Sequence, residues 1–374
     1  MLRNVNVRKP FVIAIIIWGC LSQNIVAAQP FSITASESWE ETSEVDIGNL
    51  NSSVVLFEGL RSGPALPRLI GNFVYYTSAT SIEIVDTKNG CRGKGIYRIS
   101  LEDKVETKVS DIDCVVDLIH DKASAYVIHR DNGELILSKV TEVSVTPEIN
   151  AELAKKIRAA LGFKRASLKL PPGKPFQFIS YAIHNERLLI LAQLADTKSH
   201  LFSIWIDKNT KTPDSKSIQS IPFPGRLHEL ALLSDGSTLI GTKLEDGETK
   251  FGRLIQINFQ ENTARSLGTD AAMGSESNEG SSEQLSIRTP RLLRECPGGA
   301  LVADLTPFLF SETRSLFFYS TSTNRYQRSN ISAQDISGVE WTHNGLLVAR
   351  AQVGKIIWYG TGNPFLKTNV EVNQ

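Results

Sequence analysis

Short polar turns recur along this chain, and each lies between two apolar, strand-like runs. The turns are Gly71-Asn72, His120-Asp121, His184-Asn185, Asp235-Gly236, Gly298-Gly299 and Asn344-Gly345. Successive turns are roughly 46 to 64 residues apart, near the period expected when one four-stranded unit is repeated around an axis. Asp-Gly and Asn-Gly supply the positive backbone angles that two-residue hairpins require. The pattern therefore predicts six repeats of one antiparallel unit.

Six such units predict an all-β fold, a β-propeller of six four-stranded blades. The strands expected in the fourth and sixth repeats are 229–233, 238–242, 251–259 and 263–267, then 339–342, 346–351, 355–359 and 369–372. Residues 29–64 contain apolar runs without a clear hairpin turn. They either add an outer strand beside the last blade and close the ring, which we favour, or form an irregular seventh blade.

Two of the intervals between turns are longer than the others, and each contains an insertion. Residues 147–161 have proline at the first helical position and apolar residues at every fourth position, which predicts an amphipathic helix. Residues 269–286 are rich in Ser, Gly, Glu and Asn, which predicts a mobile loop.

The first 28 residues have the pattern of a secretory signal peptide. Basic residues precede an apolar stretch from Phe11 to Leu21, and small residues follow at Ala27 and Ala28. The apolar stretch is too short to span a bilayer. We therefore expect residues 29–374 to form a single exported domain, periplasmic or extracellular, with no membrane span after cleavage. The alternative is a lipoprotein anchored through Cys20.

The charge balance argues against nucleic acid as a partner. Forty basic residues balance forty acidic ones, so the chain has no general attraction to phosphate backbones.

The mature chain has three cysteines, Cys91, Cys114 and Cys296. In a propeller, the loop that contains Cys91 and the link that contains Cys114 emerge on the same face in adjacent blades, whereas Cys296 lies beside a hairpin turn on the opposite face. We therefore predict a disulfide between Cys91 and Cys114 and a lone thiol at Cys296, because an exported protein matures in an oxidising compartment. The alternative is that all three are reduced. Under the first prediction, the glycine-rich segment 89–95 is a long loop held by the disulfide rather than an anion site.

The histidines offer weak candidates for a site. His120, His184 and His343 share one register in three repeats, and three imidazoles can bind a metal. We interpret them as polar turn residues, since their repeats are not all neighbours. His228 and Glu229, at the channel end of an inner strand, are better ligand-facing candidates.

The chain resembles the exported β-propellers of the TolB, NHL and WD40-like groups over residues 66–372, on the basis of repeat period and hairpin turns. It has no Trp-Asp dipeptides at the ends of third strands, unlike true WD40 repeats. The metal-dependent lactonase propellers resemble it in architecture, and they would imply a calcium-like ion held by Glu, Asn and Asp in the central channel.

We expect a non-catalytic propeller that binds a protein or peptide through the face bearing its inter-blade loops, without a cofactor. The sequence contains no Ser-nucleophile elbow, zincin motif or phosphate-binding loop. One alternative is a metal-dependent hydrolase or lactonase with a divalent cation in the channel. Its ligand candidates would be Glu229, Asp111, Asp113 and Asp335. The other alternative is a sugar or small-ligand binder that stacks its ligand on an aromatic residue such as Trp341.

Overall fold

The computed structural model describes most of the repeat region of the chain. The described segments are residues 50, 53–60, 63–79, 90–121, 124–184, 187–194, 200–222, 226–233, 238–244, 252–267, 290–296, 298–304, 315–320, 325–333, 335–342 and 345–360. The predicted signal segment, with Cys20, and the predicted loop at 269–286 lie outside these residues. None of the described helices is long and apolar enough to cross a membrane.

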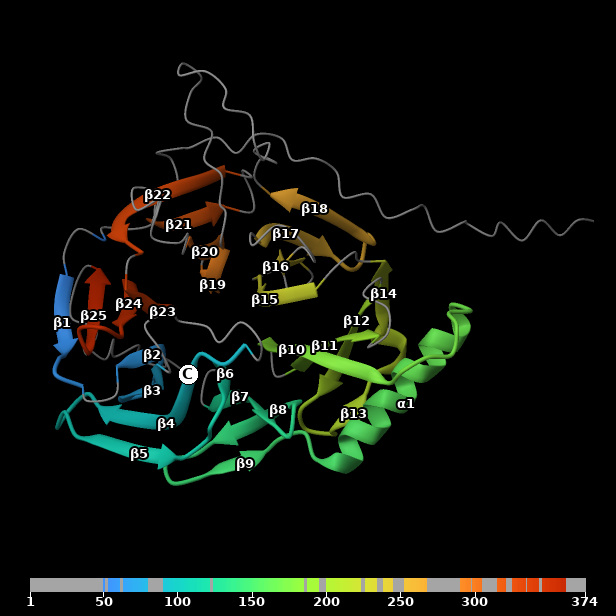
Figure 1. Ribbon diagram of the computed structural model, residues 1–374, viewed down its shortest axis with the longest axis horizontal. Helices are drawn as coiled ribbons and strands as arrows, with labels where there is room; N and C mark the ends of the chain where they lie inside the picture. Colours follow the sequence, from blue (N-terminus) through green and yellow to red (C-terminus); the bar gives the residue numbers. More distant parts are fainter. Residues whose placement is uncertain are drawn as a thin grey trace, which may run out of the picture. The chain divides into compact units, whose positions relative to one another are not determined.

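Antiparallel strands make up most of the described chain (Figure 1). The largest sheet has eight strands, which are β2 (Pro64–Ile70), β3 (Phe73–Ala79), β4 (Gly93–Ser100), β5 (Glu106–Ser110), β6 (Val115–His120), β7 (Ala125–Asp131), β8 (Glu134–Val140) and β9 (Val145–Pro147). One residue pair alone, Gly93 with Val115, joins β4 to β6. This single pair divides the sheet into two groups of strands, β2 to β5 and β6 to β9.

Four further sheets follow along the chain. Their strands are β10 (Phe176–His184), β11 (Arg187–Leu194), β12 (His200–Asp207), β13 (Thr212–Pro213) and β14 (Gln219–Pro222); β15 (Arg226–Leu232), β16 (Thr238–Leu244), β17 (Gly252–Asn258) and β18 (Thr263–Leu267); β19 (Pro290–Cys296), β20 (Gly299–Asp304), β21 (Ser315–Ser320) and β22 (Arg325–Ser332); and β23 (Ile336–Thr342), β24 (Gly345–Arg350) and β25 (Lys355–Gly360) with β1 (Ser53–Phe57). A short 3-10 turn, η1 (Ser215–Ser217), precedes β14.

Each of the six sequence turns lies between two hydrogen-bonded strands of one group. These pairs are β2-β3, β6-β7, β10-β11, β15-β16, β19-β20 and β23-β24. Gly71 illustrates the local cause, since its φ of 58° is a left-handed conformation that glycine adopts at little cost. The turn residues Asn185, Asp235, Gly236 and Asn344 lie outside the described part of the chain.

The amino-terminal strand pairs with the carboxyl-terminal strand. β1 is antiparallel to β25, with Val54 opposite Trp358 and Val55 opposite Ile357, and the two lie side by side in Figure 1. β1 is thus the outer strand of the last sheet among the described residues. The outer strand expected at 369–372 lies outside the described residues.

Neighbouring groups contact one another through their first strands, which we define as β2, β6, β10, β15, β19 and β23. The contacts run β2 to β6, β6 to β10, β10 to β15, β15 to β19, β19 to β23 and β23 to β2. Apolar side chains fill the spaces between the groups. Leu66 and Val339 are fully buried in one cluster, and Ile190 and Ile204 in the next. Burying a side chain of this kind contributes about 1.5 to 3 kcal/mol, so these clusters hold the sheets together.

The inserted helix is present, but it begins and ends later than predicted. α1 (Ala151–Ser167) contacts β12 and β13 (Figure 1). Pro147, predicted to take the first helical position, instead pairs with Ser138 of β8 as part of β9. Asn150 caps the helix, because its side-chain oxygen accepts a hydrogen bond from the Leu153 amide at 2.8 Å.

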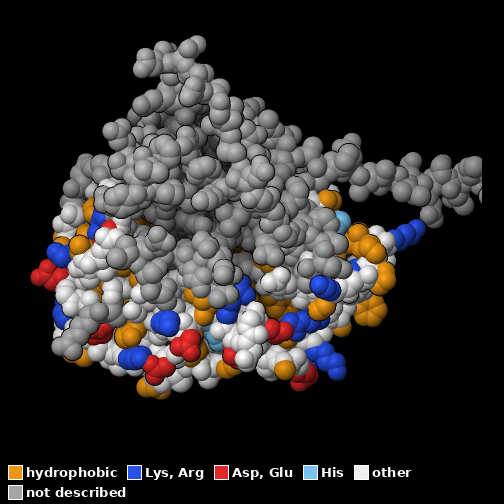
Figure 2. Space-filling model, viewed as in Figure 1, with side chains coloured by type: hydrophobic (Ala, Val, Ile, Leu, Met, Phe, Trp, Pro, Cys, Tyr) orange, Lys and Arg blue, Asp and Glu red, His pale blue; other side chains and the backbone are white. Residues whose placement is uncertain are grey.

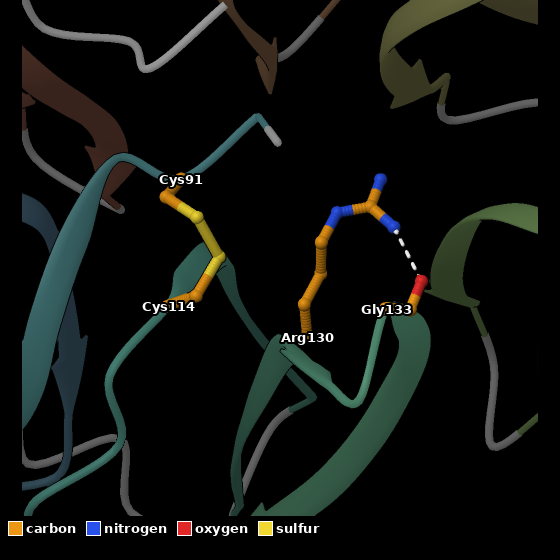
Figure 3. The surroundings of a disulfide bond; sticks show 4 residues. All are labelled: Cys91, Cys114, Arg130 and Gly133. Atoms are coloured by element: carbon orange, nitrogen blue, oxygen red, sulfur yellow. Dashed lines mark hydrogen bonds between the residues drawn. A yellow bond between two sulfur atoms is a disulfide. The ribbon is translucent and has the colours of Figure 1, made fainter. Parts of the chain in front are cut away.

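Cys91 and Cys114 form the predicted disulfide, with 5.1 Å between their Cα atoms (Figure 3). The backbone around it is also paired, since the Arg92 amide donates to the Val115 carbonyl and the Arg130 amide to the Cys114 carbonyl. Among the described residues, Cys296 is the free cysteine, and it is buried. Both observations confirm the predicted cysteine arrangement.

Charged side chains of both signs are interspersed over the described part of the face in Figure 2. This distribution agrees with the equal numbers of acidic and basic residues in the sequence.

Candidate functional site

A cavity of about 470 Å³ lies among the first strands. Every first strand contributes to its lining, which includes Arg68, Asp117, Tyr181, Leu230, Arg294 and Glu340. The lining residues come from the carboxyl-terminal parts of these strands, next to the hairpin turns. We call this side the hairpin-turn end. The disulfide belongs to the opposite end, since Cys91 lies two residues before β4 and Cys114 directly precedes β6.

A local irregularity in each first strand shapes this cavity. Each strand shifts its register against its hairpin partner, and the residues directly after the shifts are Arg68, Asp117, Ser180, Leu230, Arg294 and Gly338. A β-bulge bends its strand and re-aims the next side chain. Three of the re-aimed residues are charged, and they meet in the cavity.

We call Arg68, Asp117 and Arg294 the arginine cluster. The Asp117 Oδ1 atom accepts hydrogen bonds from Arg68 Nη2 at 3.2 Å and from Arg294 Nη2 at 2.5 Å. The same oxygen accepts the Leu118 amide at 2.8 Å. β6 and β19 are not neighbours, because other first strands lie between them in both directions. The Arg294–Asp117 ion pair therefore spans the cavity.

Arg68 is the most deeply buried member of the cluster, with 3% of its side chain exposed. Its Nη1 atom donates to the backbone carbonyls of Pro67 and Val339, so it links β2 to β23. Burial and then the charge of Arg294 lower the pKa of Arg68 to about 10, against the opposite effect of Asp117 and Glu340. The cluster thus places two guanidinium groups in a largely buried site.

His120 and Glu340 form a second ion pair in the wall of the cavity. His120 Nε2 lies 2.6 Å from Glu340 Oε1, and the other Glu340 oxygen accepts the Leu69 amide at 2.5 Å. His120 Nδ1 lies 3.0 Å from the Asp121 carbonyl oxygen, which accepts a hydrogen bond from it. Burial lowers the pKa of His120, but the hydrogen bond and charge of Glu340 outweigh it, so the net shift of this pKa is upward. With both ring nitrogens donating, the geometry fits an imidazolium.

The rest of the wall is apolar except for Tyr181 and Glu295. Ile183, Leu230, Leu232 and Trp341 line it together with the buried Cys296. Burial, and then the charge of Glu295, raise the pKa of the Cys296 thiol well above its usual value. A thiol in this state is a poor nucleophile. The cavity therefore combines fixed charges with an apolar wall, which is the usual composition of a ligand site.

The structure places the acidic residues predicted from sequence away from this lining. Asp111 and Asp113 are exposed in the link between β5 and β6, where Asp111 pairs with Lys108. Asp335 precedes β23 and accepts the Gln352 amide at 2.8 Å. Burial raises the pKa of Asp335, more than the hydrogen bond from Gln352 lowers it.

The other two predicted site residues, His228 and Glu229, belong to β15, but their side chains lie outside the described part of the structure. Among the described residues, no group of three or more His, Cys, Asp and Glu side chains is arranged to hold a metal ion.

Sequence reasoning missed the residues that form the charged part of the cavity. His120 was expected to be a polar turn residue, and its pairing with Glu340 was not foreseen. His184 ends β10, and His343 lies outside the described residues. A usable signal was present, because Arg68, Asp117 and Glu340 each interrupt an otherwise apolar first strand. A charge at such a position has to be paired or has to face a cavity.

Neither protein-family models nor curated proteins gave a match to this sequence. Solved structures resemble it in fold. A protein of unknown function from Bacteroides thetaiotaomicron is 11% identical with a TM-score of 0.51, and the alignment covers 84% of this chain and 74% of that one. A gluconolactonase from Xanthomonas campestris is 8% identical with a TM-score of 0.51, and the alignment covers 89% of this chain and 99% of that one. At these identities the likeness concerns the fold, so the chain has the β-propeller fold of its structural neighbours, and no specific family is assigned.

Proposed function

We propose that this chain is a six-bladed β-propeller that acts by binding a peptide. The blade number is supported by the six strand groups, of which five have four strands and the group of β10 to β14 has five, and by the contacts that lead from each first strand to the next and back to β2. The pairing of β1 with β25 supports closure by the amino-terminal strand. Closure of this kind leaves no open sheet edge at the seam.

Export of the protein is part of this proposal. The disulfide between Cys91 and Cys114 supports it, because such bonds persist in oxidising compartments. The signal-like pattern of residues 1–28 supports it independently.

The single observation that carries the binding function is the cavity among the first strands. Its volume of about 470 Å³ lies in the range of sites that hold small ligands or one to two peptide residues. Its charged side chains are held by one another, so they are pre-organised for a ligand. We therefore place the proposed binding site at the hairpin-turn end. The sequence alone instead predicts binding at the face that bears the inter-blade loops.

An affinity selection tests the proposal. A synthetic mixture of octapeptides with free termini is incubated with the purified protein, and retained peptides are identified by mass spectrometry. Ile183→Trp fills the cavity, and Val143→Trp adds the same side chain at a position that is 84% exposed. We expect selected peptides to bind the wild type and Val143→Trp, and to bind Ile183→Trp at least ten-fold more weakly. Failure to select any peptide, or equal binding to all three proteins, would refute the proposal.

A sugar binder is the second candidate, favoured by the position of Trp341 in the cavity wall. Aromatic faces pack against the apolar faces of sugar rings. Thermal shift against a panel of mono- and disaccharides tests it, with Trp341→Phe as the variant that keeps an aromatic ring and Trp341→Leu as the one that removes it. No shift with any sugar would dismiss this candidate.

A further inference from the structure

We infer that the outward face of α1 binds a bilayer surface that carries anionic phospholipids, with Phe163 as an apolar anchor and nearby lysines as the electrostatic contact. This inference goes beyond the proposed function, because no residue of α1 is among those lining the cavity. It concerns peripheral binding to one leaflet, with no segment inserted across the membrane.

One face of α1 is buried and the opposite face is exposed. Leu153, Ile157 and Leu161 recur every four residues and are buried where the helix packs along β12 and β13 (Figure 1). Ala159 and Phe163 lie one turn apart on the other side of the helix, and both are exposed. The helix therefore buries its apolar stripe within its own fold, and its outer face is available to a second surface.

Phe163 is the most exposed large apolar side chain of the helix, at 80%. Single exposed apolar residues are common on protein surfaces, so Phe163 gains its meaning from its surroundings. Ala159 and Ala166 flank it at helical spacing and are too small to cover its ring. Leu168, directly after the helix, is 39% exposed. Phenylalanine and leucine are the side chains that enter the boundary between headgroups and acyl chains when a helix lies on a bilayer.

Positive charge is concentrated in the same segment. Residues 151–170 contain six basic residues and one acidic residue, whereas the whole chain contains forty of each. The acidic residues on and beside α1 are already paired, namely Glu152 with Lys156, Glu134 with Arg158, Glu148 with Lys211 and Asp214 with Arg187. Within the described part of the chain, Lys155, Lys164 and Lys169 form no ion pair. The helix is therefore a positively charged region on a protein without net charge.

The different roles of arginine and lysine favour a lipid surface over a protein partner. Arg158 lies over the ring of Phe178 at 4.8 Å, and Arg165 donates to the backbone carbonyls of Pro171 and Lys174. Both arginines of the helix are thus engaged within the fold, and the remaining cations are lysines. A protein carboxylate is recognised best by the planar fork of arginine. A layer of phosphate headgroups attracts lysine equally well, because it requires positive charge without a fixed geometry.

Vesicle flotation with the purified protein tests this inference. Vesicles of phosphatidylcholine with about one-third phosphatidylglycerol are compared with vesicles of phosphatidylcholine alone. We expect binding to the anionic vesicles to be about ten-fold or more stronger. Raising the salt from roughly 0.05 M to roughly 0.5 M should remove most of this difference, because salt screens the attraction between exposed lysines and headgroups.

A pair of lysine variants tests the electrostatic contact. Lys155→Gln combined with Lys169→Gln should weaken binding to anionic vesicles about ten-fold. Lys94→Gln combined with Lys108→Gln is the matched control, since it removes the same charge at exposed positions of β4 and β5. The control should leave vesicle binding nearly unchanged. Equal losses in the two double variants would mean that net charge, rather than α1, determines binding.

Variants of Phe163 test the apolar anchor. Phe163→Ala should weaken binding to anionic vesicles several-fold, because it removes the ring that would leave water. Phe163→Leu keeps an apolar side chain and should retain most of the binding. Val105→Ala shortens a side chain that is 55% exposed in another part of the protein, and it should have no effect. Thermal melts verify that each variant is folded, which is expected because all these positions are exposed.

The outcomes separate a lipid surface from an acidic protein partner. Poly-L-glutamate serves as the soluble probe for an acidic protein segment. If this probe binds α1 and anionic vesicles do not, the inference is wrong and the helix face accommodates an acidic protein. Equal binding to both kinds of vesicle, or vesicle binding that survives the lysine and phenylalanine variants, also overturns the inference. Ile183→Trp, which fills the cavity, should bind vesicles like the wild type, so failure of this inference is distinct from failure of the peptide function.

Discussion

Five of the six charged residues that line the cavity, Arg68, Asp117, His120, Arg294 and Glu340, have a partner from another strand. Asp117 accepts from two arginines on β2 and β19, and Glu340 accepts from His120 and from a backbone amide. A buried charge without a partner costs several kcal/mol. These pairs therefore explain how a largely apolar cavity tolerates these five charged side chains, and they make the stability of the fold sensitive to pH.

Glu340→Gln should change the pH dependence of stability. The folded protein has a raised pKa at His120, whereas the unfolded chain has the ordinary value of 6.5. The ion pair therefore stabilises the fold fully below about pH 6.5, and this contribution is lost as the pH rises through the raised pKa of the folded state. Urea unfolding between about pH 5.5 and 9 should show the largest difference in unfolding free energy between wild type and variant at the acidic end.

Two further measurements isolate this pair. Glu142→Gln removes an ion pair with Arg98 at a carboxylate that is 69% exposed, and it should shift stability little at any pH in this range. The proton NMR titration of His120 should give a pKa above the ordinary value in the wild type and below that of the wild type in Glu340→Gln. Parallel stability profiles for wild type and Glu340→Gln would show that the pair does not stabilise the fold.

At the scale of single elements, α1 depends on its amino-terminal cap. Asn150→Ala removes the side-chain oxygen that accepts the Leu153 amide, and we expect a loss of about 1 kcal/mol in unfolding free energy. Asn150→Ser keeps an acceptor and should retain most of that stability. Lys155→Ala, at an exposed helix position, is the control and should change stability little. Urea titration at neutral pH measures all three, and equal stability of the alanine and serine variants would argue against the cap.

The disulfide fastens two neighbouring strand groups, because Cys91 precedes β4 and Cys114 precedes β6. The two cysteines are 23 residues apart, and closing a loop of that length contributes about 3 kcal/mol. Replacing both with serine should lower the melting temperature by several degrees and make it independent of added reductant. The melting temperature of the wild type is also measured with reductant, under conditions in which the unfolded chain is reduced. If reductant does not lower this temperature, the bond contributes little to stability.

Hairpins were the elements that the sequence predicted best, because their formation depends on the residues of the turn and of the strands next to it. Gly71 and Gly298 adopt positive φ angles in their turns, and the strands on either side have the predicted apolar residues. The start of α1 was less accessible, because Pro147 is compatible with both a first helical turn and an edge strand. In the structure Pro147 pairs with Ser138 of β8 and therefore belongs to a strand.

The cavity could not be derived from the sequence, since it depends on which strands face one another. Arg68, Asp117 and Arg294 are far apart along the chain, and register shifts in three hairpins aim them at one point. The sequence does show charges inside apolar strands, but it does not show their partners. The polar candidates that stood out in sequence, Asp111 and Asp113, are exposed outside the cavity.

At the scale of the whole molecule, the pairing of β1 with β25 brings the first and last strands of the described chain together. This pair joins residues that are about three hundred positions apart, and it covers the edge that β25 would otherwise expose. Val55 lies opposite Ile357, and neither side chain is buried. Directly opposed residues of an antiparallel pair lie close enough for a disulfide. Val55→Cys combined with Ile357→Cys should therefore crosslink on mild oxidation and raise the melting temperature, because the bond closes a very long loop.

A register control makes this prediction specific. Val54→Cys with Ile357→Cys places the two thiols one residue out of register and on opposite faces of the sheet, so it should remain reduced under the same conditions. Peptide mapping without reductant identifies the bond and separates it from the Cys91–Cys114 pair. If the in-register pair stays reduced, or if both pairs crosslink to the same extent, the last sheet is not completed by β1 in the register described. The protein would then have to stabilise the edge of β25 by some other segment, since an uncovered β25 would pair with other chains.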